Sequence, residues 1–391
     1  MKGHIRKRSS ASWEVRYDFG ANPATGKRRV ATVTVRGDRK AAEKELRRLL
    51  RTVDDGSHVD PSHVTVRRWL ETWLQTVQSE TSPKTSERYA EICQNFLMPA
   101  LGNISLTKLA PTQIQTAYNA WAIGGRLDGK AGGLSPQTCR HMHRVLRTAL
   151  ARAVEQQLIA RNPADVFKKR LPKVERKELV TLTADQSARL LEALAHSRVY
   201  WPVLLALATG MRRGEILALR WKNVDLENGT LRVVESLEQT KTTMRFKSPK
   251  SGRHRAITLP GYAVTELRRL KREQAEALLS LGVRQSGDTL VCCRADGEPH
   301  QPLSLTYEFA RFMRRLKDLP RVRFHDLRHS HATQLLASGV HPKIASERLG
   351  HASVGITLDL YSHVTDTMQG EAAAKLDTAM QAAKSRLMKN K

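Results

Sequence analysis

Two imidazoles, a guanidinium group and a phenol follow one another within residues 324–365 of the chain. His325 and Arg328 are three residues apart, so on a helix they share one face. His351 follows a Leu-Gly pair, and Tyr361 comes one short segment later. Cationic donors of this kind bind a phosphodiester, and a phenol beside them can attack it. The stretch therefore indicates a site that holds a phosphate and forms a covalent bond to it through tyrosine.

A second informative stretch lies far upstream, at residues 208–221. Gly210 and Gly214 bracket a pair of arginines, Arg212 and Arg213, where one predicted helix ends and the next begins. Backbone donors and guanidinium groups at the start of a helix suit an anion. Glu215 follows Arg212 by three residues and can hold it in place. The alternative is a surface turn with ordinary charges.

The bulk composition favours a polyanionic partner. The formal net charge is +28 over 391 residues, and the pI is about 10.4. A chain this basic is expected to bind nucleic acid, although a solvated basic surface is the alternative reading. The four cysteines show no zinc-site spacing, and neither a signal peptide nor a membrane span is predicted. We therefore expect a cytoplasmic protein without disulfides or membrane contact.

The first 55 residues are predicted to form a small basic sheet backed by a helix. They hold 15 Lys and Arg residues against 7 Asp and Glu residues. Alternating patterns predict strands at 13–19 and 29–35 joined by a turn at 22–27, with an edge strand at 5–8. Asp38 is expected to cap a helix over 39–52. Such a sheet can lay its strands in the DNA major groove; an RNA-binding or purely structural module is the alternative.

Residues 63–168 are predicted to be all helical, between linkers at 56–64 and 168–180. Helix-start signals occur at Thr65, Ser82, Pro111 and Ser135. The helix after Ser135 is expected to carry a polar side that contacts DNA or is simply solvated. The residues expected on that side are Arg140, His141, His143, Arg144 and Arg147.

The remainder, residues 178–391, is predicted to be mainly helical with a small antiparallel sheet. Helices are expected at 183–195, 203–209, 262–279 and 371–388. Strands are expected at 231–234 and 289–293, together with a hairpin formed by 243–246 and 254–259 around the turn 247–252. The helices and the hairpin must bring the two chemistry-bearing stretches together for a site to form.

These motifs resemble the tyrosine recombinase family, in particular its phage and integrative-element integrases. The resemblance rests on Thr209–Glu215, on His325-Asp326-Leu327-Arg328-His329, on Leu349-Gly350-His351 and on Tyr361. It covers about half of the chain, and the N-terminal half is similar in architecture only. It implies a multidomain fold: a small sheet-plus-helix arm-type DNA-binding domain (1–55), an all-helical core-DNA-binding domain (63–168), and a mainly helical catalytic domain with a small antiparallel sheet (178–391).

The resemblance also implies a role for each residue. Tyr361 would attack the scissile phosphate and leave a 3′-phosphotyrosine and a free 5′-hydroxyl. Arg212 and Arg328 would neutralise the non-bridging oxygens, while His325 and His351 would donate hydrogen bonds to the phosphate. His325 would also be the candidate to take the phenolic proton. Lys250 fits best as the general acid that protonates the leaving oxygen, with Lys247 as the alternative. His329, His331 and His363 are expected to have no chemical role, and Asp326 is expected to cap a helix or pair with an arginine.

The implied reaction needs no metal and no other cofactor. The expected partners are double-stranded DNA at core and arm sites, three further copies of the chain in a homotetramer, and a DNA-bending or directionality factor. Whether Tyr361 acts within its own subunit or on a neighbour's site stays open. A resolvase or chromosome-dimer recombinase is the nearest alternative; a non-catalytic DNA-binding regulator on the same scaffold is a more distant one.

Overall fold

The computed structural model divides into two compact units, Met1–Arg176 and Lys177–Lys391. It describes residues 3–21, 26, 28–54, 64–167, 171–175, 179–249, 252, 254–361 and 365–389. The predicted linkers at 56–64 and 168–180 and the predicted turn at 22–27 lie partly outside these residues. No helix in the described ranges is long and apolar enough to cross a membrane.

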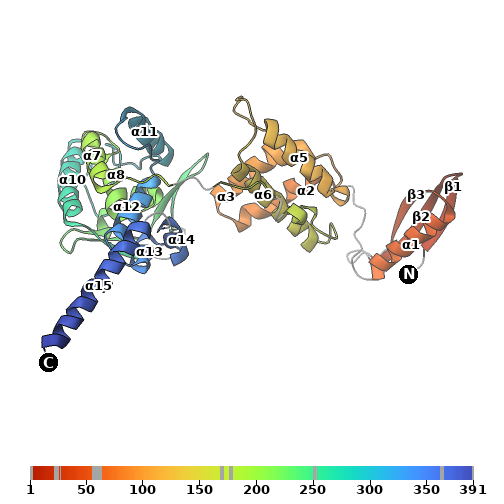
Figure 1. Cartoon of the computed structure of the whole chain (residues 1–391). Helices are drawn as coiled ribbons and strands as arrows, with labels where there is room; N and C mark the ends of the chain where they lie inside the picture. Colours follow the sequence, from red (N-terminus) through yellow and green to blue (C-terminus); the bar gives the residue numbers. More distant parts are fainter. Residues whose placement is uncertain are drawn as a thin grey trace. The chain divides into compact units, whose positions relative to one another are not determined.

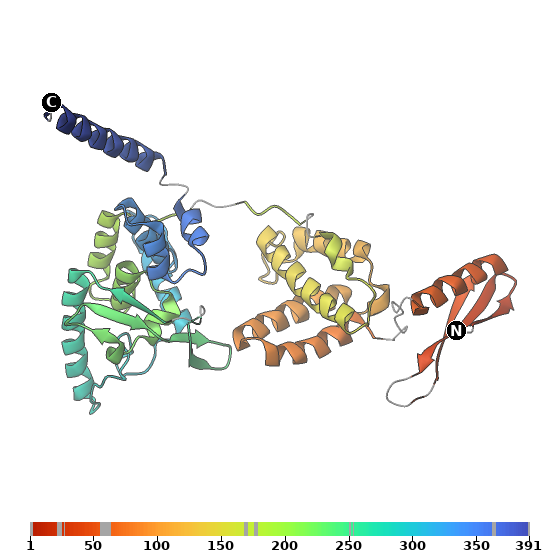
Figure 2. The same ribbon diagram turned by 90° about the horizontal axis from the view of Figure 1, so that it is seen from below.

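The N-terminal segment forms a three-stranded antiparallel sheet with one helix. The strands β1 (Gly3–Ser9), β2 (Ser12–Ala21) and β3 (Arg28–Arg36) lie in sequence order, and α1 (Arg39–Asp54) runs along one face of the sheet (Figures 1 and 2). Val15 and Tyr17 of the central strand are buried against the helix side. The Asp38 carboxylate accepts the Ala41 N–H at 2.8 Å, which confirms the predicted cap.

The second segment of this unit is helical, as predicted. It contains α2 (Val66–Glu80), α3 (Pro83–Ile92), a π-helical turn (Cys93–Leu97), α4 (Met98–Leu101), α5 (Pro111–Gly124) and α6 (Pro136–Glu155), with 3₁₀ turns at Leu106–Lys108 and Pro163–Phe167. The side chains of Thr65, Ser82 and Ser135 cap α2, α3 and α6 as expected. Trp69 donates its indole N–H to the Ala149 carbonyl at 2.9 Å and so ties α2 to α6 inside the core.

His143 corrects the prediction that all five basic residues of α6 lie on its polar side. It is 5 % exposed, and its Nδ1 lies 2.8 Å from the Tyr118 hydroxyl of α5. A histidine can be buried in this way because its ring packs like an apolar group once its polar atom has a partner. The other four, Arg140, His141, Arg144 and Arg147, keep contact with solvent.

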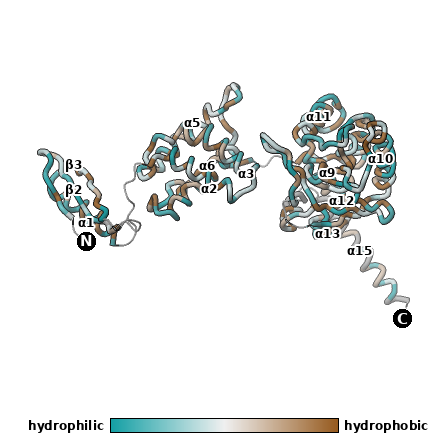
Figure 3. Tube along the Cα trace, turned by 180° about the vertical axis from the view of Figure 1, so that it is seen from behind, coloured by the Kyte–Doolittle hydropathy of each residue, from teal (hydrophilic) through white to brown (hydrophobic). Residues whose placement is uncertain are grey.

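The second unit is built around α8 (Tyr200–Thr209), an apolar helix in which every residue except Trp201 is buried. Its neighbours α7 (Ala184–Leu194), α9 (Arg213–Ala218), α10 (Gly261–Ser280) and α12 (Asp326–Ala337) pack against it. Figure 3 shows hydrophobic segments around α9 and α12 and hydrophilic ones along the outside. The remaining helices are α11 (Pro302–Arg315), α13 (Pro342–Leu349), α14 (Val354–Tyr361), α15 (Thr365–Lys389) and a 3₁₀ turn at Trp221–Asn223.

The strand pairing differs from the predicted hairpin. β7 (Met244–Lys247) pairs with β6 (Ser236–Gln239), whereas β8 (Arg255–Thr258) pairs with β5 (Thr230–Val233) in the order β4-β5-β8, where β4 is Val224–Asp225. The buried side chains explain the outcome: Ile257 of β8 lies opposite Leu231 of β5, and both belong to the core. The β6–β7 hairpin closes locally through Thr240 and Thr243 and forms its own two-stranded sheet.

The prediction of a strand at 289–293 is also wrong. Leu290 and Cys293 form only isolated bridges, to Arg220 and Pro299 respectively. The apolar run there is buried in the core without a continuous ladder, and burial alone cannot separate these two cases from sequence.

Candidate active site

The turn between α8 and α9 positions Arg212. Gly210 ends α8 in the left-handed conformation (φ +66°), and a Cβ atom there would come within 2.6 Å of the His331 and Leu349 side chains. Arg212 follows as the N-cap of α9, and its backbone N–H donates to the Glu215 carboxylate at 2.9 Å. The tight turn therefore needs glycine, and Glu215 fixes the backbone of Arg212 as the sequence predicted.

Glu215 also holds two guanidinium groups. It is 1 % exposed and accepts Nη1 of Arg212 at 3.0 Å and two N–H groups of Arg255 at 2.6 and 3.2 Å. Burial alone would raise the pKa of Glu215, but the hydrogen bonds and charge of Arg255 and Arg212 outweigh it and lower the pKa. The carboxylate therefore stays ionised and ties β8 to the start of α9.

Arg328 of α12 reaches the same turn from the opposite side. It is 3 % exposed, and its two terminal nitrogens donate to the carbonyls of Gly210 and Leu349, each at 2.7 Å. Burial, followed by the charge of Arg212, lowers the pKa of Arg328 to about 9, so the group remains protonated at neutral pH. Arg212 donates its other terminal nitrogen to the next carbonyl along, that of Gly350, at 3.0 Å.

These carbonyls lie at the C-terminal ends of two helices. Gly210 is the C-cap of α8, and Leu349 and Gly350 end α13. A helix C-terminus carries partial negative charge, which stabilises a nearby cation. Helix ends therefore offset part of the repulsion between Arg212 and Arg328 and keep the two like charges close to one another.

The two predicted site histidines lie on either side of Arg328 in the chain. His325 is the N-cap of α12, and its ring meets that of His329 edge to face at 5.1 Å. His351 directly follows Gly350, and its Nδ1 lies 2.8 Å from the Thr357 hydroxyl. Desolvation first, then nearby positive groups, lower the pKa of each of His325 and His351 to about 4. Both imidazoles are therefore neutral at pH 7 in the free protein.

Tyr361 and Lys250 complete the set of six predicted site residues. Tyr361 is the final residue of α14, but its side chain lies outside the described part of the chain. Lys250 and His363 also lie outside the described residues. The alternative lysine, Lys247, ends β7 and forms an ion pair with Glu238, which accepts Arg245 as well.

Two half-buried arginines, Arg255 and Arg348, contact this site although sequence analysis did not select them. Arg255 donates to the Arg348 carbonyl at 2.9 Å in addition to its bonds with Glu215. Arg348 donates to His331 Nε2 at 3.1 Å and to the carbonyls of Thr258 and Ala208 at 2.8 and 3.0 Å. The position of Arg348 directly before the Leu-Gly-His motif was a usable signal. No spacing in the sequence connects Arg255 with Glu215.

Two polar residues beside the motif positions, His331 and Asp326, have partners within the protein. His331 is buried in the framework of the site, with Nδ1 2.7 Å from the Leu207 carbonyl. Since Nε2 accepts from Arg348, Nδ1 carries the proton and His331 is neutral. Asp326 accepts the backbone and side-chain N–H groups of Arg323 at 2.7 to 3.0 Å, which confirms that it pairs with an arginine.

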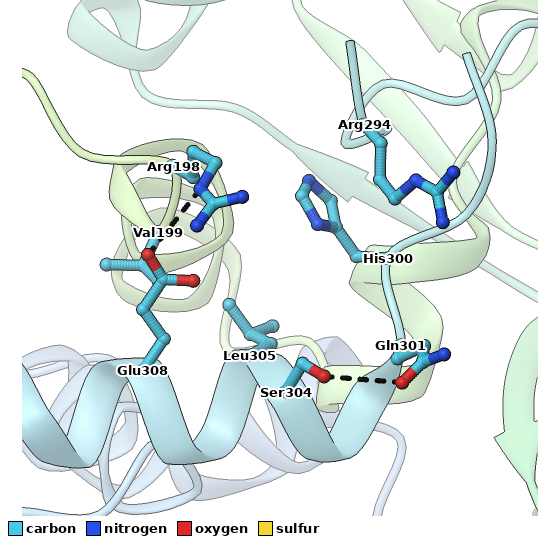
Figure 4. A pocket seen from close by; sticks show the side chains of 8 residues that line it. All are labelled: Arg198, Val199, Arg294, His300, Gln301, Ser304, Leu305 and Glu308. Carbon is cyan, nitrogen blue, oxygen red and sulfur yellow. Dashed lines mark hydrogen bonds and ion pairs between the residues drawn. The ribbon is translucent and has the colours of Figure 1, made fainter. Parts of the chain in front are cut away.

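A separate cavity lies at the other end of α8. It holds about 300 Å³ between the start of α8, the loop before α11 and α11 itself (Figure 4). Arg198 and Glu308 face one another there at 3.7 Å, and His300 lies across from them. None of the four predicted site residues whose side chains the structure describes, Arg212, His325, Arg328 and His351, lines this cavity.

Comparison with known proteins identifies the family. The model described as Phage integrase family matches residues 180–368, and that of the Phage integrase, N-terminal SAM-like domain matches residues 65–122. Together these matches cover more than half of the chain. The chain belongs to the phage integrase family. As a tyrosine recombinase of this family it is a site-specific recombinase, an enzyme that cleaves and rejoins DNA.

Relatives span nearly the whole integrase. A "Tyrosine recombinase XerC-like" protein of Caldanaerobacter subterraneus subsp. tengcongensis is 28% identical over 87% of this chain and 89% of its own length. The "ICEBs1 integrase" of Bacillus subtilis is 26% identical over 95% of this chain and 99% of its own length. Two integrase structures share the fold. The Tn1549 transposon integrase with a circular intermediate DNA matches with a TM-score of 0.66 and 20% identity, over 80% of this chain and 99% of that chain. A lambda integrase tetramer bound to a Holliday junction matches with a TM-score of 0.59 and 20% identity, over 91% of this chain and 94% of that chain. The predicted multidomain recombinase fold is confirmed.

Proposed function

We propose that the integrase binds a scissile DNA phosphate between Arg212 and Arg328 and attacks it with Tyr361. One observation carries the proposal: two arginines far apart in the sequence anchor on the adjacent carbonyls of Leu349 and Gly350. Adjacent guanidinium groups match the non-bridging oxygens, where negative charge increases in the transition state. Attack leaves a 3′-phosphotyrosine and a free 5′-hydroxyl, and the reverse reaction rejoins the strand.

The histidines and a lysine supply the proton chemistry of this proposal. A tyrosine with a pKa near 10 is a weak nucleophile at neutral pH, so it needs help to lose its proton. His325 is neutral at pH 7 and is the proposed acceptor, while His351 donates a hydrogen bond to the phosphate. Lys250 is the proposed general acid, because Lys247 is engaged by Glu238.

The proposed substrate is the attachment-site DNA of a mobile element. The integrase of the Bacillus subtilis element ICEBs1 and that of the transposon Tn1549 support this, as does the basic N-terminal sheet. Residues 63–168 would bind the core site and residues 1–55 the arm site. Two strand exchanges need four active sites, so we propose a homotetramer, assisted by a DNA-bending or directionality factor and acting in the cytoplasm.

The test is covalent trapping with Tyr361→Phe. A labelled duplex carrying the DNA that flanks the gene is incubated with each protein, and covalent adducts are separated under denaturing conditions. The wild type should form an adduct that is sensitive to protease. Tyr361→Phe should bind the duplex with similar affinity and form none, because the ring lacks the attacking oxygen. An adduct with the variant would refute the nucleophile assignment.

A further inference from the structure

Thr357 is a buried hydroxyl on α14, and the other residues of this helix whose burial the structure describes, 354–356 and 358, are exposed. Thr357 is 0 % exposed, whereas its apolar neighbours on α14, namely Val354, Ile356 and Leu358, are exposed. This inverts the ordinary pattern, in which apolar groups are buried and hydroxyls face solvent. The buried hydroxyl lies 2.8 Å from Nδ1 of His351, and its helix ends at Tyr361. The buried hydroxyl is therefore placed to form a hydrogen bond with the His351 ring.

The direction of this hydrogen bond follows because a buried hydroxyl proton requires an acceptor. Within the part of the chain that the structure describes, Nδ1 of His351 is the one acceptor bonded to the Thr357 hydroxyl. If Nδ1 were the donor, the hydroxyl proton would be buried without an acceptor, which costs about 1–3 kcal/mol. The arrangement in which Thr357 donates and Nδ1 accepts leaves no unsatisfied proton.

The hydrogen bond from Thr357 to Nδ1 decides whether Nε2 of His351 is a donor or an acceptor. A neutral imidazole carries one proton, and its two nitrogens have opposite roles. When Nδ1 accepts, Nε2 carries the proton and is a donor, which attracts a phosphate oxygen. The opposite tautomer would present a lone pair, which repels that oxygen. Since burial and nearby Arg328 keep the ring neutral at pH 7, the tautomer and not the charge sets its contribution.

We propose that Thr357 is a positioning residue, which holds His351 in the Nε2–H tautomer so that the ring donates to the scissile phosphate. The functional half of this inference rests on the proposed function of His351. The tautomer itself is a property of the free protein, so it can be measured without DNA.

The first experiment is ¹⁵N NMR of the full-length protein labelled at histidine, with the His351 signals assigned from their loss in His351→Gln. We expect the wild type to show the Nε2–H pattern. Thr357→Val keeps the shape and removes the hydroxyl, so His351 should shift toward the Nδ1–H form or a mixture; Thr357→Ser should retain the wild-type pattern. A wild-type Nδ1–H signature, or an unchanged tautomer in Thr357→Val, would overturn the proposal.

The second experiment is single-turnover cleavage of the same labelled duplex that tests Tyr361→Phe. Thr357→Val should slow adduct formation by about tenfold to a hundredfold, as loss of an oriented donor does, with little change in DNA affinity. Thr357→Ser should restore most of the rate. A purely structural role would instead lower the melting temperature and impair both variants alike, which counts against the proposal. If the wild type formed no adduct, the proposed function would fail while the tautomer result stood.

Discussion

At the scale of single residues, the site is a set of cations held by backbone oxygens and one carboxylate. The motif positions Arg212, His325, Arg328, His351 and Tyr361 could be selected from the sequence because their types and order are unusual. Glu215 could be selected as the support of Arg212 because it lies one helical turn away, but the carbonyl anchors and Arg255 could not, because hydrogen bonds between distant segments leave no periodic pattern in a sequence. Arg255 reads as one more residue of an alternating strand, yet it lies against Glu215 with its side chain 9 % exposed.

The choice between two lysines is testable at this scale. Lys250→Ala should reduce cleavage of ordinary DNA by about 10²–10⁴-fold, the usual contribution of a general acid. A substrate with a 5′-bridging phosphorothiolate should restore the rate, because its leaving group needs no proton. Lys247→Ala, in which Glu238 keeps its ion pair with Arg245, is the matched control and should not be rescued. Rescue of Lys247→Ala in place of Lys250→Ala would reverse the assignment.

At the scale of elements, two helix ends meet at the site, and glycine makes each possible. Gly210 and Gly350 have φ of +66° and end α8 and α13. Helix starts, caps and apolar faces were predictable because they depend on neighbours in sequence. The pairing of β8 with β5 was not, because it depends on which strand presents a buried partner such as Leu231. Local turn signals favoured the wrong hairpin.

Gly210→Ala should destabilise the second unit. Left-handed backbone costs a non-glycine residue roughly 1–2 kcal/mol, and the new Cβ would also crowd His331 and Leu349. We expect a loss of about 2–4 kcal/mol in the free energy of urea unfolding, with weaker DNA cleavage because Arg328 anchors on the Gly210 carbonyl. Gly261→Ala is the control: a Cβ there meets open space at the start of α10, so its stability should be nearly unchanged. Equal stability of the two variants would contradict the role of Gly210.

At the scale of the whole molecule, the described residues form separate hydrophobic cores for the N-terminal sheet, the helical segment and the C-terminal unit. Strand and helix patterns together with the linkers predicted three segments, and the net charge of +28 predicted a nucleic-acid partner. Neither signal predicts the DNA sequence that a segment would bind, because base recognition depends on individual side chains outside the motifs.

Removal of residues 1–54 should separate arm binding from core cleavage. We expect affinity for the arm duplex to fall by about 10³-fold, to the non-specific level, with core adduct formation retained. Arg16→Ala is the matching point variant, because Val15 and Tyr17 are buried and Arg16 therefore faces away from α1. Arg51→Ala on α1 removes the same charge and is its control. Footprinting of the arm duplex provides the measurement, and an unchanged footprint after the deletion would exclude this role.

The anchoring of Arg212 and Arg328 on carbonyls of Gly210, Leu349 and Gly350 has a consequence for evolutionary drift. A carbonyl oxygen stays the same whichever side chain its residue carries. Most substitutions along α8 and α13 therefore leave the contacts that space the two cations untouched, provided the glycine turns remain. We therefore expect relatives that share only 24–28% of their residues with this chain to be able to keep the spacing of the two proposed phosphate-binding arginines.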